Sequence, residues 1–116
     1  GDICGAKAVR GVMEKYPEIR FLMGHSCYGE WEEAVKVAQD FPHAYLELTA
    51  AYAVGGLVAY FVEQVGAEKV LFGTDAPWFD PHYPMGCVIF AEISDEDRRN
   101  IFYRNAERLL GIELGD

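Results

Sequence analysis

The sequence has 116 residues, enough for one modest domain, and its formal net charge is -9. This acidity argues against binding to nucleic acid or to an anionic membrane, because both attract basic surfaces. No run approaches the roughly 18 apolar residues that a membrane-spanning helix needs. The chain begins with neither an initiator Met nor a signal-peptide pattern, so we expect it to start inside a longer protein. An odd, widely spaced set of three cysteines favours reduced thiols in a cytoplasmic protein.

Helical and strand patterns alternate along the chain. Apolar spacing predicts helices over 6–16, 30–41, 57–65 and 85–92, and a last helix over 95–110 that Ser94 begins and Gly111 ends. Short apolar runs predict strands over 19–23, 44–49 and 70–73. The strand centres, Phe21, Leu46 and Leu71, are spaced by 25 residues. Strands separated by single helices at this period are typical of parallel βα units.

The expected fold class is therefore α/β, with three parallel βα units. Three strands alone would leave unpaired backbone groups along both sheet edges. A complete (β/α)8 barrel needs about 250 residues, more than twice this length. Two architectures remain: a small open sheet, or part of a barrel.

Two polar side chains follow expected strands at matching places. His25 comes after the first strand and Asp75 after the third, within a Leu-Phe-Gly-Thr-Asp-Ala-Pro stretch at 71–77. Parallel strands place such residues on one edge of the sheet. Imidazole nitrogen and carboxylate oxygen are ligands of a catalytic divalent metal such as zinc, which would lower the pKa of its water to about 7. The alternative is that His25 bonds to its own loop and Asp75 caps the following turn.

Further candidates surround this pair. Trp78 and His82, in the aromatic loop after Asp75, are candidates for substrate binding, or they pack onto their own surface. On the middle strand, Glu47 could line the same pocket or could be an ion-paired structural residue. Asn105 lies on the apolar side of the last helix, and we expect its amide to attach that helix to backbone groups.

Three motifs resemble one known family. They are Phe-Leu-Met-Gly-His at 21–25, Val-Leu-Phe-Gly-Thr-Asp-Ala-Pro at 70–77 and Asn-Ala-Glu-Arg-Leu-Leu-Gly at 105–111. In this order they look like the closing third of the amidohydrolase-related (amidohydrolase 2) metal-dependent hydrolases, TIM-barrel enzymes that include the ACMSD-type decarboxylases. The resemblance implies that the three strands are barrel strands six, seven and eight. It also implies that His25 binds metal or activates its water, and that Asp75 is a metal ligand and general base.

The family's remaining metal ligands, a His-x-His and a further histidine, would lie upstream of Gly1. A zinc site needs three protein ligands plus water, and this chain offers two. We therefore expect the parent to be an enzyme that uses zinc or manganese to activate water. It would hydrolyse an amide, ester or lactone, or decarboxylate a small molecule. This chain alone should be inactive and should need its N-terminal barrel portion or self-association. The alternative is a non-catalytic α/β segment or small binding domain that oligomerises through its sheet edges.

Overall fold

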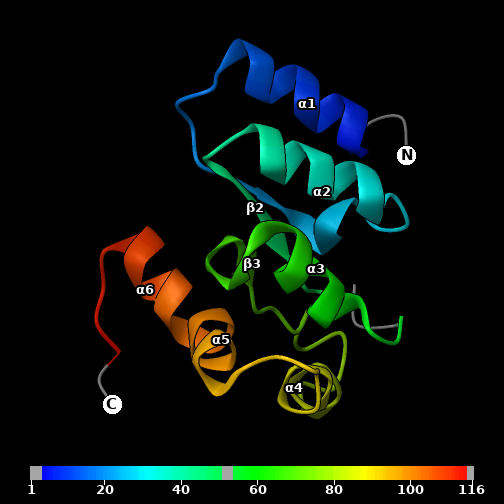
Figure 1. Cartoon of the computed structure of the whole chain (residues 1–116), viewed down its shortest axis with the longest axis vertical. Helices are drawn as coiled ribbons and strands as arrows, with labels where there is room; N and C mark the ends of the chain where they lie inside the picture. The colour runs from blue at the N-terminus through cyan, green and yellow to red at the C-terminus, as the bar shows by residue number, and fades with distance from the viewer. Residues whose placement is uncertain (1–3, 51–53, 115–116) are drawn as a thin grey trace.

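The computed structural model describes residues 4–50 and 54–114, so the chain start at 1–3 lies outside the described residues. Its main elements follow in chain order (Figure 1): α1 (Ala6–Lys15), β1 (Phe21–Met23), α2 (Trp31–Asp40), β2 (Ala44–Glu47), α3 (Leu57–Val65), β3 (Val70–Leu71), α4 (His82–Ile89), α5 (Asp95–Arg99) and α6 (Asn105–Leu110). Short helical turns are η1 (Gly24–Cys27), η3 (Ala67–Lys69) and the π-helical η4 (Asn100–Arg104). In the described ranges, no helix is long and apolar enough to cross a membrane.

The sheet confirms three parallel strands in the order β1-β2-β3. Phe21 pairs with Ala44, and Leu46 pairs with Val70. The strands are shorter than the sequence predicted. Ile19 is not part of β1 because its N–H donates to the Tyr16 carbonyl in a turn.

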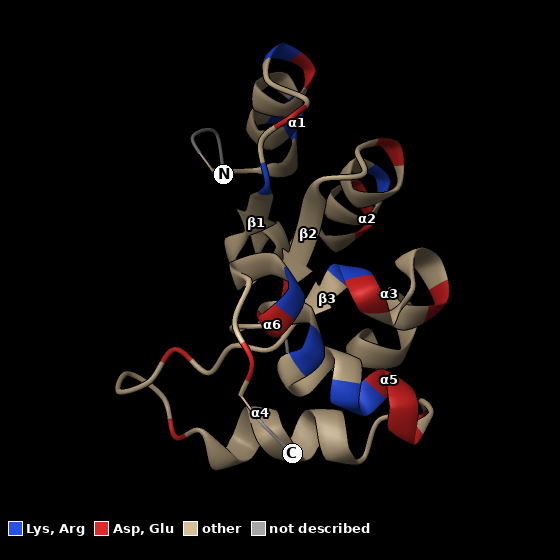
Figure 2. Ribbon diagram, turned by 90° about the vertical axis from the view of Figure 1, so that its left-hand side faces the viewer, with Lys and Arg blue, Asp and Glu red and all other residues tan. Residues whose placement is uncertain are grey.

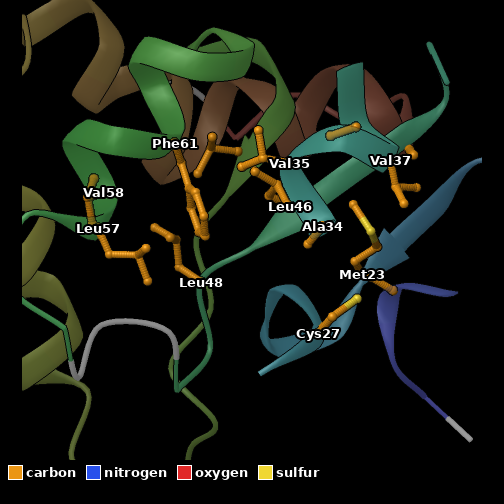
Figure 3. Packing of buried hydrophobic residues seen from close by; sticks show 14 of the residues in the cluster. Met23, Cys27, Ala34, Val35, Val37, Leu46, Leu48, Leu57, Val58 and Phe61 are labelled. Atoms are coloured by element: carbon orange, nitrogen blue, oxygen red, sulfur yellow. The ribbon is translucent and has the colours of Figure 1, made fainter. Parts of the chain in front are cut away.

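Helices α2 and α3 lie against one face of the sheet (Figure 2). Leu46 and Leu48 point into this layer and meet Phe61 of α3 (Figure 3). Because side chains alternate along a strand, Glu47 lies on the opposite face from these leucines. The apolar core thus packs against one face of β2, and the Glu47 side chain lies on the other face, outside that core.

The last helical region covers 95–110 as predicted, but a π-helical turn divides it. Ser94 caps its start, since the Ser94 Oγ accepts a hydrogen bond from the Asp97 N–H at 3.0 Å. Gly111 ends it with a left-handed φ of 67°. The buried Asn105 amide donates to the carbonyls of Ala67 at 2.7 Å and Val70 at 2.8 Å, which confirms its expected attachment to backbone.

The helix predicted over 85–92 was misplaced: α4 runs from His82 to Ile89. The Asp80 Oδ1 accepts a hydrogen bond from the His82 N–H at 2.9 Å, and Pro81 has φ −65°, which suits a helix start. Pro84 is tolerated because N–H groups of a first helical turn have no intrahelical partner. Pro84 therefore lies in the first turn of α4, ahead of the helix start predicted at 85, and Pro81 lies at the N-cap.

Candidate functional site

The candidate site lies where the carboxyl ends of the three parallel strands meet. His25 is in the η1 turn after β1, Glu47 is the last residue of β2, and Asp75 is in the loop after β3. Because the strands are parallel and β2 is central, Glu47 occupies the position between the two loops. The placement of His25 and Asp75 at one edge agrees with the sequence-based expectation.

The η1 turn has an unusual backbone. His25, Ser26 and Cys27 all have left-handed φ values, 57°, 46° and 59°. Residues other than glycine cost roughly 1–3 kcal/mol each in such sparsely populated conformations, so the surroundings must hold the turn. The buried Ser26 does this directly: its Oγ accepts from the Glu47 N–H at 3.1 Å and donates to the Glu47 carbonyl at 2.8 Å. This hydroxyl supplies the partners that a neighbouring strand would otherwise give to the end of β2.

The Glu47 carboxylate uses both of its oxygens. Its Oε2 accepts from the His25 N–H at 3.0 Å. Its Oε1 accepts from the Thr49 N–H at 2.8 Å and from the Thr49 hydroxyl. The side chain is only 17% exposed. Glu47 thus binds the η1 turn to the loop after β2, a more specific role than the structural ion pair considered from the sequence.

Gly73 brings the end of β3 into the same cluster. A Cβ built on Gly73 would lie 1.8 Å from the Glu47 Oε1 and 2.2 Å from the Thr49 Oγ1. Heavy atoms cannot approach that closely, so the Glu47 carboxylate occupies space that any side chain at position 73 would need. The ends of all three strands therefore meet at one carboxylate.

The backbone N–H of His25 is hydrogen-bonded, but one ring nitrogen is not. The ring Nδ1 is buried without a hydrogen-bond partner among the described residues, and it lies 4.0 Å from the Glu47 Oε2. The side chain as a whole is 45% exposed. A buried polar atom without a partner is costly in a finished protein core, and it is a feature of ligand positions.

Asp75 lies in a tight turn with a left-handed φ of 59°, and its side chain is exposed. Its carbonyl, rather than its carboxylate, accepts the turn hydrogen bond from the Trp78 N–H at 2.8 Å. The sequence left open that the Asp75 side chain caps this turn. The backbone hydrogen bond already closes the turn without that side chain. The carboxylate remains available for another partner.

His25 and Asp75 carry the donor atoms that a divalent metal prefers, but they are too few to form a complete metal site. Across 4–50 and 54–114, no group of three or more His, Cys, Asp or Glu side chains could hold a metal ion. A complete zinc site needs three protein ligands. If a metal binds at this edge, further ligands must come from outside the described residues.

The two predicted substrate-binding residues lie beyond the edge of the sheet. Trp78 is 81% exposed in the loop after β3. His82 begins α4, and its side chain is 87% exposed with Nδ1 2.7 Å from the Asp80 Oδ1. Hydrogen bonds from the His82 backbone and ring hold the pKa of Asp80 below its ordinary value. Substrate binding by Trp78 and His82 stays a prediction.

The sequence did not single out Ser26, and it left the role of Glu47 open. A serine after a strand and a glutamate at a strand end carry no distinctive motif. The one signal in the sequence is Gly73, because a glycine after a strand permits close approach by backbone or ligand. The partner in that approach, the Glu47 carboxylate, became visible only from the strand register.

The sequence of the chain matches a known protein family. A family model described as "Amidohydrolase" matches residues 7–112, nearly the whole chain. The chain belongs to this family. A gamma-resorcylate decarboxylase from Polaromonas sp. strain JS666 is 26% identical over 123 residues, which cover 88% of this chain and 37% of the relative. The chain spans about 37% of the length of the curated relatives it matches.

Solved structures agree on the fold of this amidohydrolase segment. An uncharacterized TIM-barrel protein from Bordetella bronchiseptica superposes with a TM-score of 0.79 at 24% identity, covering 90% of this chain and 38% of the other. A dihydroxybenzoic acid decarboxylase from Polaromonas, solved with bound manganese and 2-nitroresorcinol, gives a TM-score of 0.67 at 21% identity, covering 91% and 38%. The three parallel βα units are thus a partial (β/α)8 barrel, as expected.

Proposed function

We propose that this chain supplies His25 and Asp75 to the metal site of an amidohydrolase-family enzyme that acts on a small molecule. The observation that carries the proposal is the buried, unpartnered His25 Nδ1 at the same sheet edge as the exposed Asp75 carboxylate. Both decarboxylation and hydrolysis of an amide, ester or lactone fit these residues. The names of the relatives favour decarboxylation of an aromatic acid.

The chemistry divides between the two residues. A divalent metal, manganese or zinc, would polarise the substrate and lower the pKa of a bound water when it is present. His25 and Asp75 would hold it, each through one nitrogen or oxygen atom. The Asp75 carboxylate would also accept a proton from water. It would return this proton to the leaving group in hydrolysis, or to the carbon that loses CO2 in decarboxylation. His25 would stabilise negative charge that develops beside it, and Trp78 would offer an aromatic face to the substrate.

Metal binding tests the site. Titration of the purified chain with Mn²⁺, followed by electron paramagnetic resonance, should show weak binding, because the chain supplies two ligands. His25→Ala and Asp75→Asn should each weaken it further. His43→Ala is the matched control, because His43 is exposed at the opposite, amino end of β2. Equal Mn²⁺ binding by all four proteins would overturn the proposed site.

Completion of the barrel tests the activity. We expect the chain alone to release no CO2 from 2,6-dihydroxybenzoate, since it offers two metal ligands. Co-expression with the N-terminal barrel portion of the Polaromonas decarboxylase should give turnover that depends on Asp75. A complex that forms and binds Mn²⁺ but never turns over any carboxylic acid, amide, ester or lactone offered would contradict the catalytic role.

The open edge of β1 is where we propose that missing barrel strands, or a second copy of the chain, attach. A groove of about 440 Å³ runs along β1 and α1, with Phe21, Leu22 and Val12 among its lining residues. Leu22 is an exposed large apolar residue there. Analytical ultracentrifugation of the chain alone should detect oligomers that Leu22→Lys weakens, whereas Leu110→Lys on α6 should not. A cooperative monomer would instead favour the small-domain alternative.

A further inference from the structure

We infer that Glu47 is the positioning residue of the site: its carboxylate sets the conformation of the η1 turn and so the place of the His25 ring. The inference deepens the proposed function and rests on it for the importance of His25. Both oxygens of the Glu47 carboxylate accept hydrogen bonds from protein groups. Glu47 acts on His25 through the backbone: the Glu47 Oε2 accepts a hydrogen bond from the His25 N–H at 3.0 Å.

The hydrogen-bond pattern requires a carboxylate. The Oε2 accepts a hydrogen bond from the His25 N–H, and the Oε1 accepts hydrogen bonds from the Thr49 N–H and hydroxyl. A hydrogen-bond donor in place of either oxygen would therefore face another donor. A glutamine has one oxygen and one NH2 group. In Glu47→Gln the oxygen would remain with the two Thr49 donors, and the NH2 group would then face the His25 N–H. The substitution keeps the shape of the side chain and breaks the contact to His25.

Gly73 offers an independent way to displace the same carboxylate. In Gly73→Ala the new Cβ would meet the Glu47 Oε1 at 1.8 Å, so the carboxylate must move although its charge is unchanged. If Glu47 positions His25, this variant should disturb the η1 turn from the far side of the cluster. Glu47→Gln and Gly73→Ala should therefore produce the same local change.

Two controls match these variants. Glu63→Gln removes one carboxylate from an exposed position on α3. Gly86→Ala adds a methyl group within α4, where a Cβ has nothing within 4 Å. Neither control touches the cluster formed by His25, Glu47 and Gly73.

Nuclear magnetic resonance of the 15N-labelled chain measures the effect without any metal or substrate. Amide exchange of His25 should accelerate about tenfold to a hundredfold in Glu47→Gln and in Gly73→Ala, because a hydrogen bond to a charged group is lost. The ring Cε1–H signal of His25 should shift in both. The Phe61 amide, in the core helix α3, should keep its exchange rate, and the signals of His43 and His82 should stay in place.

Two results would overturn the inference. In the first, the His25 amide and ring signals of both variants match the wild type. In the second, Phe61 exchange accelerates as much as His25 exchange, which would make Glu47 a residue of general stability. If His25→Ala and Asp75→Asn leave Mn²⁺ binding unchanged, the proposed metal site is wrong, but the nuclear magnetic resonance result on Glu47 still holds. The proposed function and the positioning role of Glu47 can therefore fail separately.

Discussion

Replacing Asn105 with alanine should destabilise the chain severely. The side chain is fully buried, and its Nδ2 donates to the carbonyls of Ala67 and Val70 at 2.7 and 2.8 Å. These carbonyls lie at the start of η3 and of β3, so the amide holds α6 to the third strand. Truncation leaves the Val70 carbonyl without this partner, at a cost of about 1–3 kcal/mol. The Ala67 carbonyl still accepts from the Val70 N–H, so the loss of its second hydrogen bond costs about 0.5–1.5 kcal/mol. We expect a total loss of about 2–5 kcal/mol, a large share of the about 5–15 kcal/mol typical of a domain.

Urea unfolding followed by circular dichroism gives this loss as the shift of the midpoint at constant slope. Asn105→Asp should be at least as damaging, because it points a carboxylate at two carbonyl oxygens. Asn100→Ala, at a half-buried position in η4, is the control and should cost less than about 1 kcal/mol. A loss below about 1 kcal/mol for Asn105→Ala would refute the role given to the two hydrogen bonds.

Three further predictions use other parts of the structure. Ser26→Ala should lower the free energy of unfolding in urea by about 1–3 kcal/mol, since the N–H and C=O of Glu47 lose their partner. Ser94→Ala, at a helix cap, is the comparison and should lower it by about 1 kcal/mol. An unchanged free energy of unfolding for Ser26→Ala would show that water replaces the hydroxyl. Burial raises the pKa of the Cys27 thiol, so iodoacetamide at pH 8 should alkylate the exposed Cys4 well before Cys27 by mass spectrometry, and equal rates would contradict this. Burial lowers the pKa of Lys69, so the folded state binds this proton less tightly than the unfolded chain does. The free energy of unfolding, measured relative to Lys69→Met, should therefore rise as the pH approaches 10.5. A difference between the two proteins that does not change with pH would contradict the lowered pKa.

Periodicity was enough to predict the layout of this chain. Helical spacing gave α3 with its observed bounds, and the recurrence of Phe21, Leu46 and Leu71 gave the parallel sheet. These features depend on burial, which leaves a regular trace in the order of apolar residues. The shared edge of His25 and Asp75 followed from the same reasoning, because strand direction alone decides it.

The internal structure of the site could not be predicted in this way. The Glu47 contacts join residues from three strand ends, and their meeting depends on the register of β2 against its neighbours. The left-handed η1 turn uses His25, Ser26 and Cys27 where glycine would be expected, so no local preference indicates it. Likewise, the start of α4 depends on the Asp80 side chain, whose hydrogen bond to the helix is a matter of geometry rather than composition.

The contact between Gly73 and Glu47 has a consequence for the evolution of this segment. Positions 47 and 73 are 26 residues apart in the sequence but compete for the same volume. With the Glu47 carboxylate in this place only glycine fits at 73, and any side chain at 73 must displace it. A short residue at 47 would leave room for a side chain at 73. Among members of the family that share this register, the two positions should therefore covary, with large residues alternating between them and never occurring at both.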